Sequence, residues 1–294
     1  MEWQMQLITV YCDVCEQYQS HLWMYCERMS NNSTPTFTDE EVMTIYLFGI
    51  QRKRKTVLEI YEYTRDHLAD WFPHLPSYGG YVQRLNKLSG AFPALLNAVA
   101  PTWSGPSGEG LTFLLDSMPI ILAQGRRRFQ AKVAGEVADC GYCASKNLHY
   151  YGLKLHALGI RQPGTLPHPE YLEFTSARPH DLTVLERIYP YLWHGELYAD
   201  KAYVSEVLKQ LLKHQEMELL TPSKKQKGQE KLGMFEKLWS TSVSRVRQPI
   251  ESFFNWLEER TGIQMASKVR SLNGLLVHVY GRLTAAMYVL KFNS

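Results

Sequence analysis

The fold is decided by the stretch Leu111-Thr112-Phe113-Leu114-Leu115-Asp116. Its first five residues are mostly apolar, and they follow residues 101–110, which are rich in Pro, Gly and Ser. A short apolar run after such a segment predicts a strand that is buried on both faces. Because Pro119 has no N–H to donate, it limits the strand to an edge or a bend there. A second, short strand is expected at residues 120–123.

Asp116 lies at the end of this predicted strand. A buried carboxylate costs free energy unless it is paired, protonated or bound to a metal ion. Asp is also common in caps and turns, which is the alternative interpretation of this residue. Asp116 therefore indicates a site only if other carboxylates, from later in the chain, meet it.

The composition is that of an ordinary globular protein. The 294 residues, of which 45% are hydrophobic and 21% charged, suit one large domain or two smaller ones. The net charge of +3 is only mildly basic. Basic residues nevertheless cluster at Arg126-Arg127-Arg128, at Lys224-Lys225-Gln226-Lys227 and among Arg245, Arg247, Arg260, Lys268 and Arg270. Clusters that flank candidate carboxylates favour binding of a polyanion, although solvated surface explains any one of them.

Neither export nor a membrane span is predicted. The N-terminus lacks the basic and apolar regions of a signal peptide. The longest apolar stretch, residues 272–290, is interrupted by Asn273, His278 and Arg282. An odd number of cysteines, five, fits a reducing compartment. We therefore expect a cytoplasmic protein.

Two cysteine pairs have the CxxC spacing of some zinc sites, namely Cys12/Cys15 and Cys140/Cys143. A shared site would have to bridge more than a hundred residues of sequence. Cysteines three positions apart on a helix are more often packing residues. A zinc-binding module is therefore the weaker interpretation.

Residues 1–105 predict a helical region. Apolar residues recur at helical spacing in residues 1–30, and Thr38 and Glu41 form a capping box at the start of a second helix. Further helices are expected at residues 57–68 and 81–88. Short helices joined by the basic run Arg52-Lys53-Arg54-Lys55 suggest a DNA-binding region, similar to a helix-turn-helix. The alternative is a helical scaffold that binds nothing.

Residues 106–294 combine strand and helix patterns. Later strands are expected at residues 149–158, 171–175, 196–199 and 217–221. Helices are expected at residues 181–188, 204–214, about 249–261 and 272–290. Several strands followed by alternating helices and strands predict an α/β domain, with a mixed sheet flanked by helices.

A second carboxylate, Asp200, also ends a short apolar strand, in Leu197-Tyr198-Ala199-Asp200. The alternative role is that of a helix N-cap, which Asp favours. Ligands of open α/β sheets collect at the carboxyl ends of strands. Asp116 and Asp200 are therefore candidates to lie side by side.

Glu251 is the third candidate carboxylate. It adjoins an apolar stripe made of Ile250, Phe253, Phe254 and Leu257. Pro249 suits the first turn of a helix. If the helix instead begins near Ser244, Arg247 and Glu251 share one face and Pro249 lies between them. The sequence leaves both possibilities open.

Three converging carboxylates form a hard oxygen site, which suits Mg²⁺ or Mn²⁺ better than zinc. Such a site can hold two ions about 3.5–4 Å apart, which activate the attacking oxygen and stabilise the leaving oxygen. Nearby Arg and Lys side chains would neutralise phosphate charge. The pattern is typical of phosphodiester chemistry.

The chain resembles the DDE transposases of bacterial insertion sequences over nearly its whole length. The matching segments are Leu115-Asp116-Ser117-Met118-Pro119, Gly141-Tyr142-Cys143-Ala144-Ser145-Lys146, Tyr151-Gly152-Leu153-Lys154-Leu155-His156, Ala177-Arg178-Pro179-His180-Asp181, Ala199-Asp200-Lys201-Ala202-Tyr203, Arg247 with Glu251, and Val269-Arg270-Ser271-Leu272-Asn273-Gly274-Leu275. Each segment is a modest signal, but their order and separations make the resemblance strong.

The resemblance implies an RNase H-like catalytic domain at residues 106–294, with Asp116, Asp200 and Glu251 as a triad that binds two Mg²⁺ or Mn²⁺ ions. It implies cleavage of double-stranded DNA at the terminal inverted repeats of an insertion sequence and joining to target DNA, with water and then a DNA 3′-hydroxyl as nucleophiles. A homodimer is expected in the synaptic complex. The candidate DNA-binding residues are Arg126, Arg127, Arg128, Lys201, Arg247, Arg260, Lys268 and Arg270.

The chain departs from the Tyr, Arg, Glu, Lys signature of many family members. Ser244 stands at the Tyr position and Glu258 at the Lys position, so Arg260 or Lys268 would have to replace the missing Lys. Two other functions are weighed against the transposase. One is an RNase H-like nuclease without strand transfer, and the other is a non-catalytic, DNA-binding remnant of a transposase.

Overall fold

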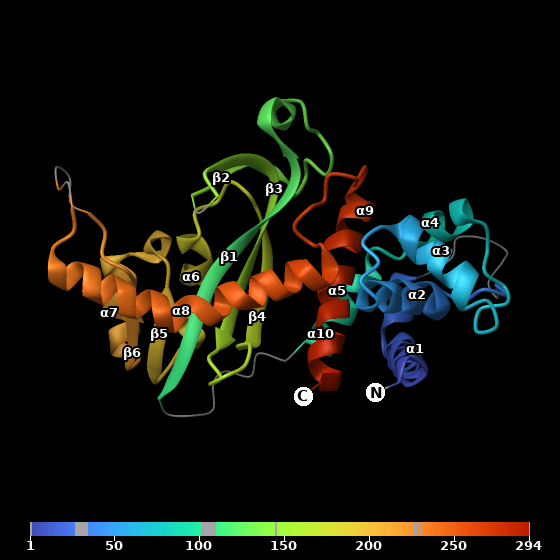
Figure 1. The fold of residues 1–294 in the computed structure, drawn as a ribbon, viewed down its shortest axis with the longest axis horizontal. Helices are drawn as coiled ribbons and strands as arrows, with labels where there is room; N and C mark the ends of the chain where they lie inside the picture. The colour runs from blue at the N-terminus through green and yellow to red at the C-terminus, as the bar shows by residue number, and fades with distance from the viewer. Residues whose placement is uncertain are drawn as a thin grey trace. The chain divides into compact units, whose positions relative to one another are not determined.

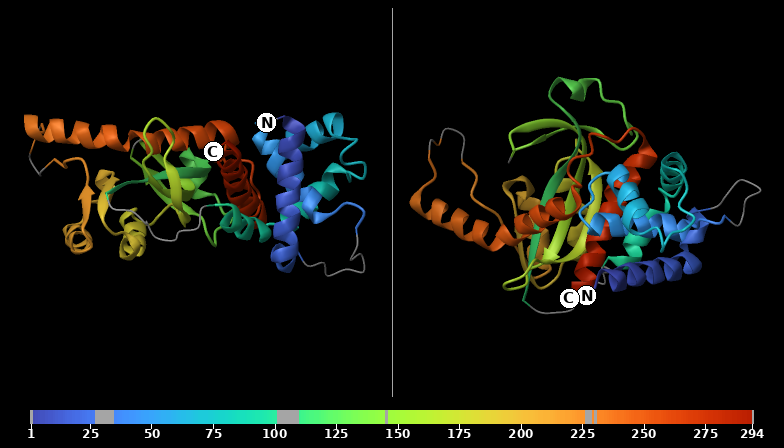
Figure 2. Two further views of the ribbon diagram at one scale, coloured as in Figure 1. Left: turned by 90° about the horizontal axis from the view of Figure 1, so that it is seen from below. Right: turned by 45° about the vertical axis from the view of Figure 1, so that its right-hand side comes forward.

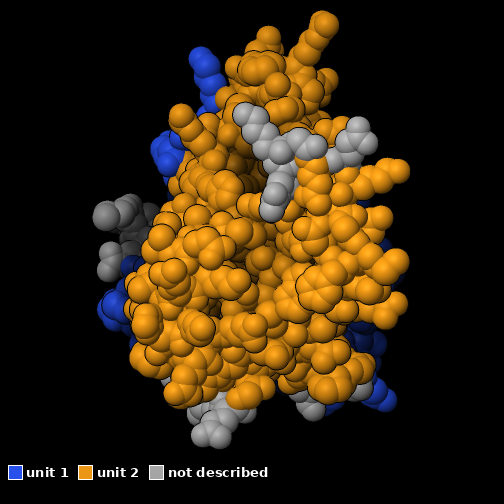
Figure 3. Space-filling model, turned by 90° about the vertical axis from the view of Figure 1, so that its left-hand side faces the viewer, with its two compact units in different colours: residues 1–100, 132–136, 257–294 blue, residues 101–131, 137–256 orange. Residues whose placement is uncertain are grey.

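The structure is a computed structural model, which describes residues 2–26, 35–100, 110–144, 146–225, 229 and 231–293. The chain forms two compact units, coloured separately in Figure 3. Unit 1 comprises Met1–Ala100, Lys132–Glu136 and Leu257–Ser294, and unit 2 comprises Pro101–Ala131 and Val137–Trp256. The boundary predicted between residues 105 and 106 lies outside the described residues. Unit 1 also takes in residues 257–294, which the sequence analysis assigned to the catalytic domain.

Unit 1 is helical, as predicted. Its helices are α1 (Trp3–Ser20), α2 (Asp39–Gln51), α3 (Val57–His67), α4 (Tyr78–Lys87), α5 (Ala91–Val99), α9 (Leu272–Leu276) and α10 (Arg282–Asn293). The capping box at α2 is confirmed, since Glu41 N–H donates to Thr38 Oγ1 at 3.2 Å and Thr38 N–H donates to Glu41 Oε2 at 2.6 Å. Helix α5 was not predicted.

The C-terminal helices belong to unit 1 because they complete its core. Helix α10 packs against α2 and α5, and Leu283 and Tyr288 are fully buried. The Tyr46 hydroxyl of α2 donates to the carbonyl of Val277 at 3.3 Å. Val277 begins a π-helical turn, Val277–Gly281, which divides the single helix predicted at residues 272–290. None of the helices in the described part of the chain is both long and apolar enough to span a bilayer.

Unit 2 contains a mixed sheet, which confirms the predicted α/β class and its RNase H-like arrangement. Its described strands are β1 (Leu111–Gln124), β2 (Asp139–Cys143), β3 (Leu148–Ile160), β4 (His168–Ser176), β5 (Gly195–Ala199) and β6 (Met217–Leu220). The order is β2-β3-β1-β5-β6, and β4 pairs with β3 beyond the end of β2. Strand β1 is antiparallel to β3 and parallel to β5, and β6 is parallel to β5.

Strand β1 joins two predicted strands into one and continues through Pro119, which lies at an edge, as the sequence predicted. The two strands expected at residues 111–115 and 120–123 are one strand of 14 residues. Pairing with β5 stops at Leu115, whereas pairing with β3 continues to Gln124. Beyond Leu115 one edge of β1 has no partner strand among the described residues, and Pro is tolerated at such an edge.

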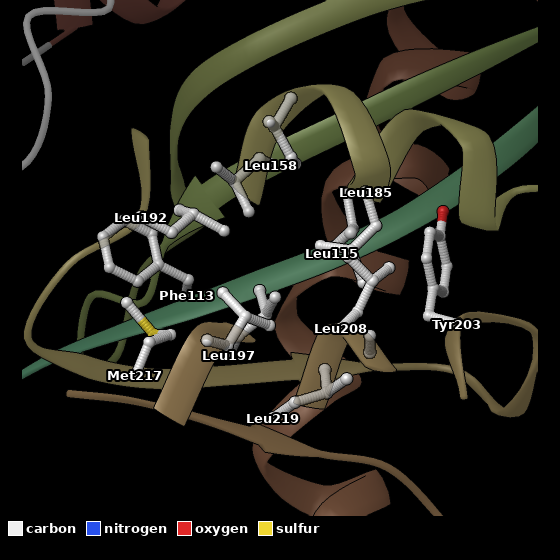
Figure 4. Packing of buried hydrophobic residues seen from close by; sticks show 13 residues of the cluster. Phe113, Leu115, Leu158, Leu185, Leu192, Leu197, Tyr203, Leu208, Met217 and Leu219 are labelled. Atoms are coloured by element: carbon white, nitrogen blue, oxygen red, sulfur yellow. The ribbon is translucent and has the colours of Figure 1, made fainter. Parts of the chain in front are cut away.

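Helices cover both faces of the sheet. Figure 2 shows α6 (Leu182–Ile188) and α7 (Glu206–His214) on one side and α8 (Met234–Thr261) on the other. The first side encloses an apolar cluster that includes Phe113, Leu115, Leu158, Leu185, Leu197, Ala199, Tyr203, Leu208 and Leu212, most of which Figure 4 labels. This cluster joins β1 and β5 to the helices that cover them.

Helix α8 settles the choice that the sequence left open. It begins at Met234, so Pro249 lies inside it and Arg247 precedes Glu251 by one turn. The predicted stripe is buried, with Ile250, Phe253 and Leu257 each at most 1% exposed. The apolar pattern near residue 250 marked only the buried part of a helix of 28 residues.

Leu197→Ala tests the cluster shared by β1 and β5. Leu197 is 0% exposed at the centre of the sheet, so its truncation should lower the free energy of unfolding by about 2–5 kcal/mol. The measurement is urea denaturation followed by circular dichroism. The same substitution at Leu238, which is 63% exposed, should change stability by less than about 0.5 kcal/mol. Equal effects at the two positions would contradict this assignment of the core.

Candidate active site

Asp116 and Asp200 follow two neighbouring parallel strands. The pairing of β1 with β5 ends at Leu115 and Ala199, and the two aspartates come next. Adjacent strands lie about 4.8 Å apart, so these side chains are neighbours. Because Leu115 and Ala199 face the cluster under α6 and α7, the alternation of side chains directs both aspartates to the face crossed by α8.

Arg247 joins Asp116 to Glu251. Its guanidinium places Nη1 2.6 Å from Asp116 Oδ2 and Nη2 2.6 Å from Glu251 Oε1. The side chain of Arg247 is 12% exposed, that of Asp116 is 17% exposed and that of Glu251 is 50% exposed. The bridge therefore runs from a largely buried strand end to a helix face that is open to solvent.

The electrostatics of Asp116 place all three carboxylates in one neighbourhood. The pKa of Asp116 is raised from 3.8 to about 6, mainly by burial. Arg247 and the N–H of Ser117 lower this pKa, whereas the negative charges of Asp200 and Glu251 raise it. Burial thus makes Asp116 a weaker acid, and a further cation nearby would favour its ionised form.

Asp200 does not act as a helix cap. It stands at the cap position of the short turn Lys201–Tyr203, but its side chain makes no capping hydrogen bond. The alternative role that the sequence allowed is therefore not the one observed. The carboxylate remains available on the same face as Asp116.

The described residues contain no group of three His, Cys, Asp or Glu side chains close enough to hold a metal ion. In the arrangement observed, the Arg247 guanidinium lies between Asp116 and Glu251, where a shared cation would otherwise lie. The donor chemistry nevertheless fits Mg²⁺ or Mn²⁺, since Asp116 and Asp200 offer carboxylate oxygens from adjacent strand ends. Glu251 is held by Arg247 in this arrangement.

The cysteines form no zinc site among the described residues. None of the five cysteines forms a disulfide. Cys140 and Cys143 lie on strand β2, which was not predicted, and not on a helix as the sequence analysis assumed. Residues three apart on a strand point to opposite faces, so this pair is poorly placed to share an ion.

The predicted DNA-binding residues are divided between the two units. Arg126, Arg127 and Arg128 lie on the turn that follows β1, Lys201 follows Asp200, and both groups belong to unit 2 together with Arg247. Arg260, Lys268 and Arg270 belong to unit 1. Most of these side chains are exposed, and Arg247, held between two carboxylates, is the most enclosed of those in unit 2.

Sequence reasoning missed an open cavity of about 580 Å³ beside Glu251. It is lined by Ser240, Thr241, Ser244, Arg245, Arg247, Gln248 and Glu251. These residues recur at helical spacing along α8, so the signal was present in the sequence. It could not be used because the helix was expected to begin near residue 249 or near Ser244, and not at Met234.

A family model described as "Transposase DDE domain" matches residues 107–271, which is more than half of the chain. The chain belongs to the DDE transposase family. No curated protein was found to match it. The matched range contains all three carboxylates, together with Arg247 and the basic residues from Arg126 to Arg270. The family generally uses divalent metal ions and acts on DNA, so the chain is a transposase by membership.

The structure explains one departure from the family signature. Glu258, at the position of the usual Lys, accepts a hydrogen bond from the N–H of Gln264 at 2.7 Å. It thereby stabilises the chain just after α8 ends at Thr261. In this transposase the position serves the fold of unit 1, and any contact of a Lys with DNA must come from another residue.

Asp116→Asn tests the charge balance at the site. Because the folded state holds the Asp116 proton up to about pH 6 and the unfolded chain releases it near 3.8, this group makes wild-type stability fall as pH rises through that window. Asn carries no such proton. The variant should therefore gain about 2–3 kcal/mol relative to wild type between pH 4 and pH 7.

Urea denaturation at several pH values measures this difference. Asp70→Asn, at an exposed position, serves as the control for loss of a carboxylate. A stability difference between Asp116→Asn and wild type that stays constant across the range would show that burial does not weaken the acidity of Asp116.

Proposed function

We propose that this transposase binds the terminal inverted repeats of its insertion sequence and catalyses metal-dependent DNA cleavage followed by strand transfer. The observation that carries the proposal is that Asp116 and Asp200 follow adjacent parallel strand ends, while Arg247 joins Asp116 to Glu251. Acidic groups that repel one another in a half-buried place are poorly suited to stability and well suited to cation binding.

Asp116, Asp200 and Glu251 would hold the metal, either Mg²⁺ or Mn²⁺, with two ions expected. Bound there, these ions would activate the attacking oxygen and stabilise the leaving oxygen of a phosphodiester. The three side chains need no covalent step, because water and then a DNA 3′-hydroxyl attack the phosphorus. Their task would be to bind the metal ions and to fix their positions.

Arg247 would act on the phosphate. In the free protein its guanidinium is neutralised by Asp116 and Glu251. A phosphodiester entering the adjoining cavity offers the same bidentate geometry as a carboxylate. Transfer of Arg247 to that phosphate would release Glu251 and draw substrate toward Asp116.

DNA binding would extend over the basic residues. Arg126, Arg127, Arg128 and Lys201 flank the carboxylates along the sequence of unit 2, and Arg260, Lys268 and Arg270 supply basic charge in unit 1. The basic run at residues 52–55, exposed between α2 and α3, suits contacts of the N-terminal helices with the repeat. A homodimer would bring two element ends together.

Alanine substitution of Asp116, Asp200 or Glu251 should abolish Mg²⁺-dependent cleavage, by at least about 10³-fold, because each removes a metal ligand. DNA binding should persist, since less negative charge faces the phosphates. The substrate is a linear DNA that carries this reading frame with its native flanks, and cleavage and strand transfer are followed on labelled ends. Glu186→Ala, an exposed carboxylate on α6, is the control.

The same assay separates the other functions. Cleavage without joined products would indicate a nuclease, and binding without cleavage by the wild type would indicate an inactive remnant. Retained cleavage by Asp200→Ala would remove that residue from the triad.

Replacing Arg126, Arg127 and Arg128 by Ala should weaken DNA binding at all sequences alike. If these side chains bind phosphates, the slope of log K against log salt should fall by about 3, because about one counterion is released per contact. Fluorescence anisotropy of a labelled duplex at several salt concentrations measures this slope. An unchanged slope would remove this turn from the DNA-binding surface.

A further inference from the structure

A largely buried polar network lies directly behind Asp116, on the sheet face covered by α6 and α7. It consists of Ser117, Lys154 and Asp181. Lys154 Nζ lies 2.7 Å from Asp181 Oδ1, and Ser117 Oγ donates to Asp181 Oδ2 at 3.1 Å. The side chains of Lys154 and Asp181 are 12% and 17% exposed. The ion pair is therefore largely withdrawn from solvent.

Asp181 does not do what its position predicts. It occupies the N-cap of α6, where an Asp commonly accepts an N–H of the first turn, yet it makes no such bond. Both carboxylate oxygens are directed to Lys154 and Ser117 instead, and Lys154 also donates to the carbonyl of Pro179 at 2.8 Å. A buried ion pair seldom stabilises a fold more than apolar residues would, so stability alone does not account for this one.

Ser117 connects the network to the site. Its side chain donates to Asp181, while its backbone N–H donates to Asp116 Oδ1 at 2.8 Å. The two interactions lie on opposite faces of β1, because neighbouring side chains of a strand alternate. The bond from Asp181 fixes Ser117 on the face covered by α6 and α7. It thereby fixes the Ser117 N–H, which orients the Asp116 carboxylate on the opposite face.

Tyr203 extends the same layer toward the second strand end. Its ring lies at the edge of the apolar cluster, three residues after Asp200 (Figure 4). Burial raises the pKa of its phenol well above the ordinary value, and the charges of Asp181 and Asp116 raise it further. The phenol is thus within electrostatic reach of both the network and the site.

We propose that Asp181, held by Lys154 and acting through Ser117, is a positioning residue that orients the Asp116 carboxylate for cation binding. The inference rests on the proposed function, because it assigns the network to the same metal-dependent site. Groups that orient metal ligands from behind typically contribute 10–100-fold to metal affinity or activity. A comparable share is expected of this network.

Two variants test the proposal without leaving a buried charge unpaired. Ser117→Ala removes only the hydroxyl link, and the double variant Asp181→Asn/Lys154→Met removes both charges together. Glu173→Gln is the matched control. Glu173 lies on β4 of the same sheet, and its substitution breaks a half-buried ion pair with Arg187 of α6 but leaves the network intact. Each full-length protein is titrated with Mn²⁺ and followed by electron paramagnetic resonance. The Mg²⁺ concentration for half-maximal cleavage is then measured on linear DNA with the native flanks.

Both variants should bind Mn²⁺ 10–100-fold more weakly than wild type and need correspondingly more Mg²⁺, with cleavage partly recovered at high metal. Glu173→Gln should match wild type in both measurements. Variants that bind Mn²⁺ and cleave as wild type does would overturn the inference and leave the proposed function standing. A fall in maximal rate without a change in metal affinity would also overturn it. A wild type that neither binds Mn²⁺ nor cleaves would overturn both.

Discussion

The parallel pairing of β1 with β5 is the constraint on which the site depends. Because the register ends at Leu115 opposite Ala199, the next residue of each strand is an aspartate, and both face α8. A shift of one residue would send one carboxylate into the apolar face. That shift is opposed by the burial of Phe113 and Leu115 against Leu197 and Ala199. Hydrophobic burial on one face thus fixes the placement of charge on the other.

Arg247 reduces the repulsion between these carboxylates in the free protein. Its guanidinium forms ion pairs with both Asp116 and Glu251, and it lowers the pKa of Asp116 against the effect of burial. One guanidinium is thus paired with two of the carboxylates that the proposed function assigns to a metal ion. Under that proposal, stability of the free protein and binding of metal make opposite demands on Arg247, a conflict that is common at functional sites.

The sequence predicted the parts of this site that depend on local pattern. Strand ends followed by Asp, the capping box of α2 and the buried stripe of α8 all follow from the spacing of apolar and capping residues. The start of α8 was not predictable in the same way. Residues 234–246 are mostly exposed, Phe235 and Leu238 among them, so this part of the helix buries little apolar surface that would set where it begins.

Other features have their cause in tertiary structure. The edge predicted at Pro119 is observed because the pairing of β1 with β5 ends first, but the continuation of β1 to Gln124 depends on β3, which no local pattern reveals. Strand β2, Asp139–Cys143, has only five residues and contains Asp and Gly, which are rare in strands, so it depends on the neighbouring β3 for its form. The assignment of residues 257–294 to unit 1 depends on the packing of α10 against α2 and α5. The ion pairs of Arg247 with Asp116 and Glu251 could be predicted only if the register of α8 and the end of the pairing between β1 and β5 were both known.

Pro249 brings these arguments together. Within a helix it removes the N–H that would bond the carbonyl of Arg245, at a cost of about 3 kcal/mol. The loss falls on the turn that carries Arg247 and Glu251, and Arg245 lines the cavity beside them. Burial of Ile250, Phe253 and Leu257 holds the helix in place across the interruption. The turn of α8 that loses this hydrogen bond is therefore the one that carries Arg247 and Glu251, and in the proposed function it is where Arg247 exchanges a carboxylate for a phosphate.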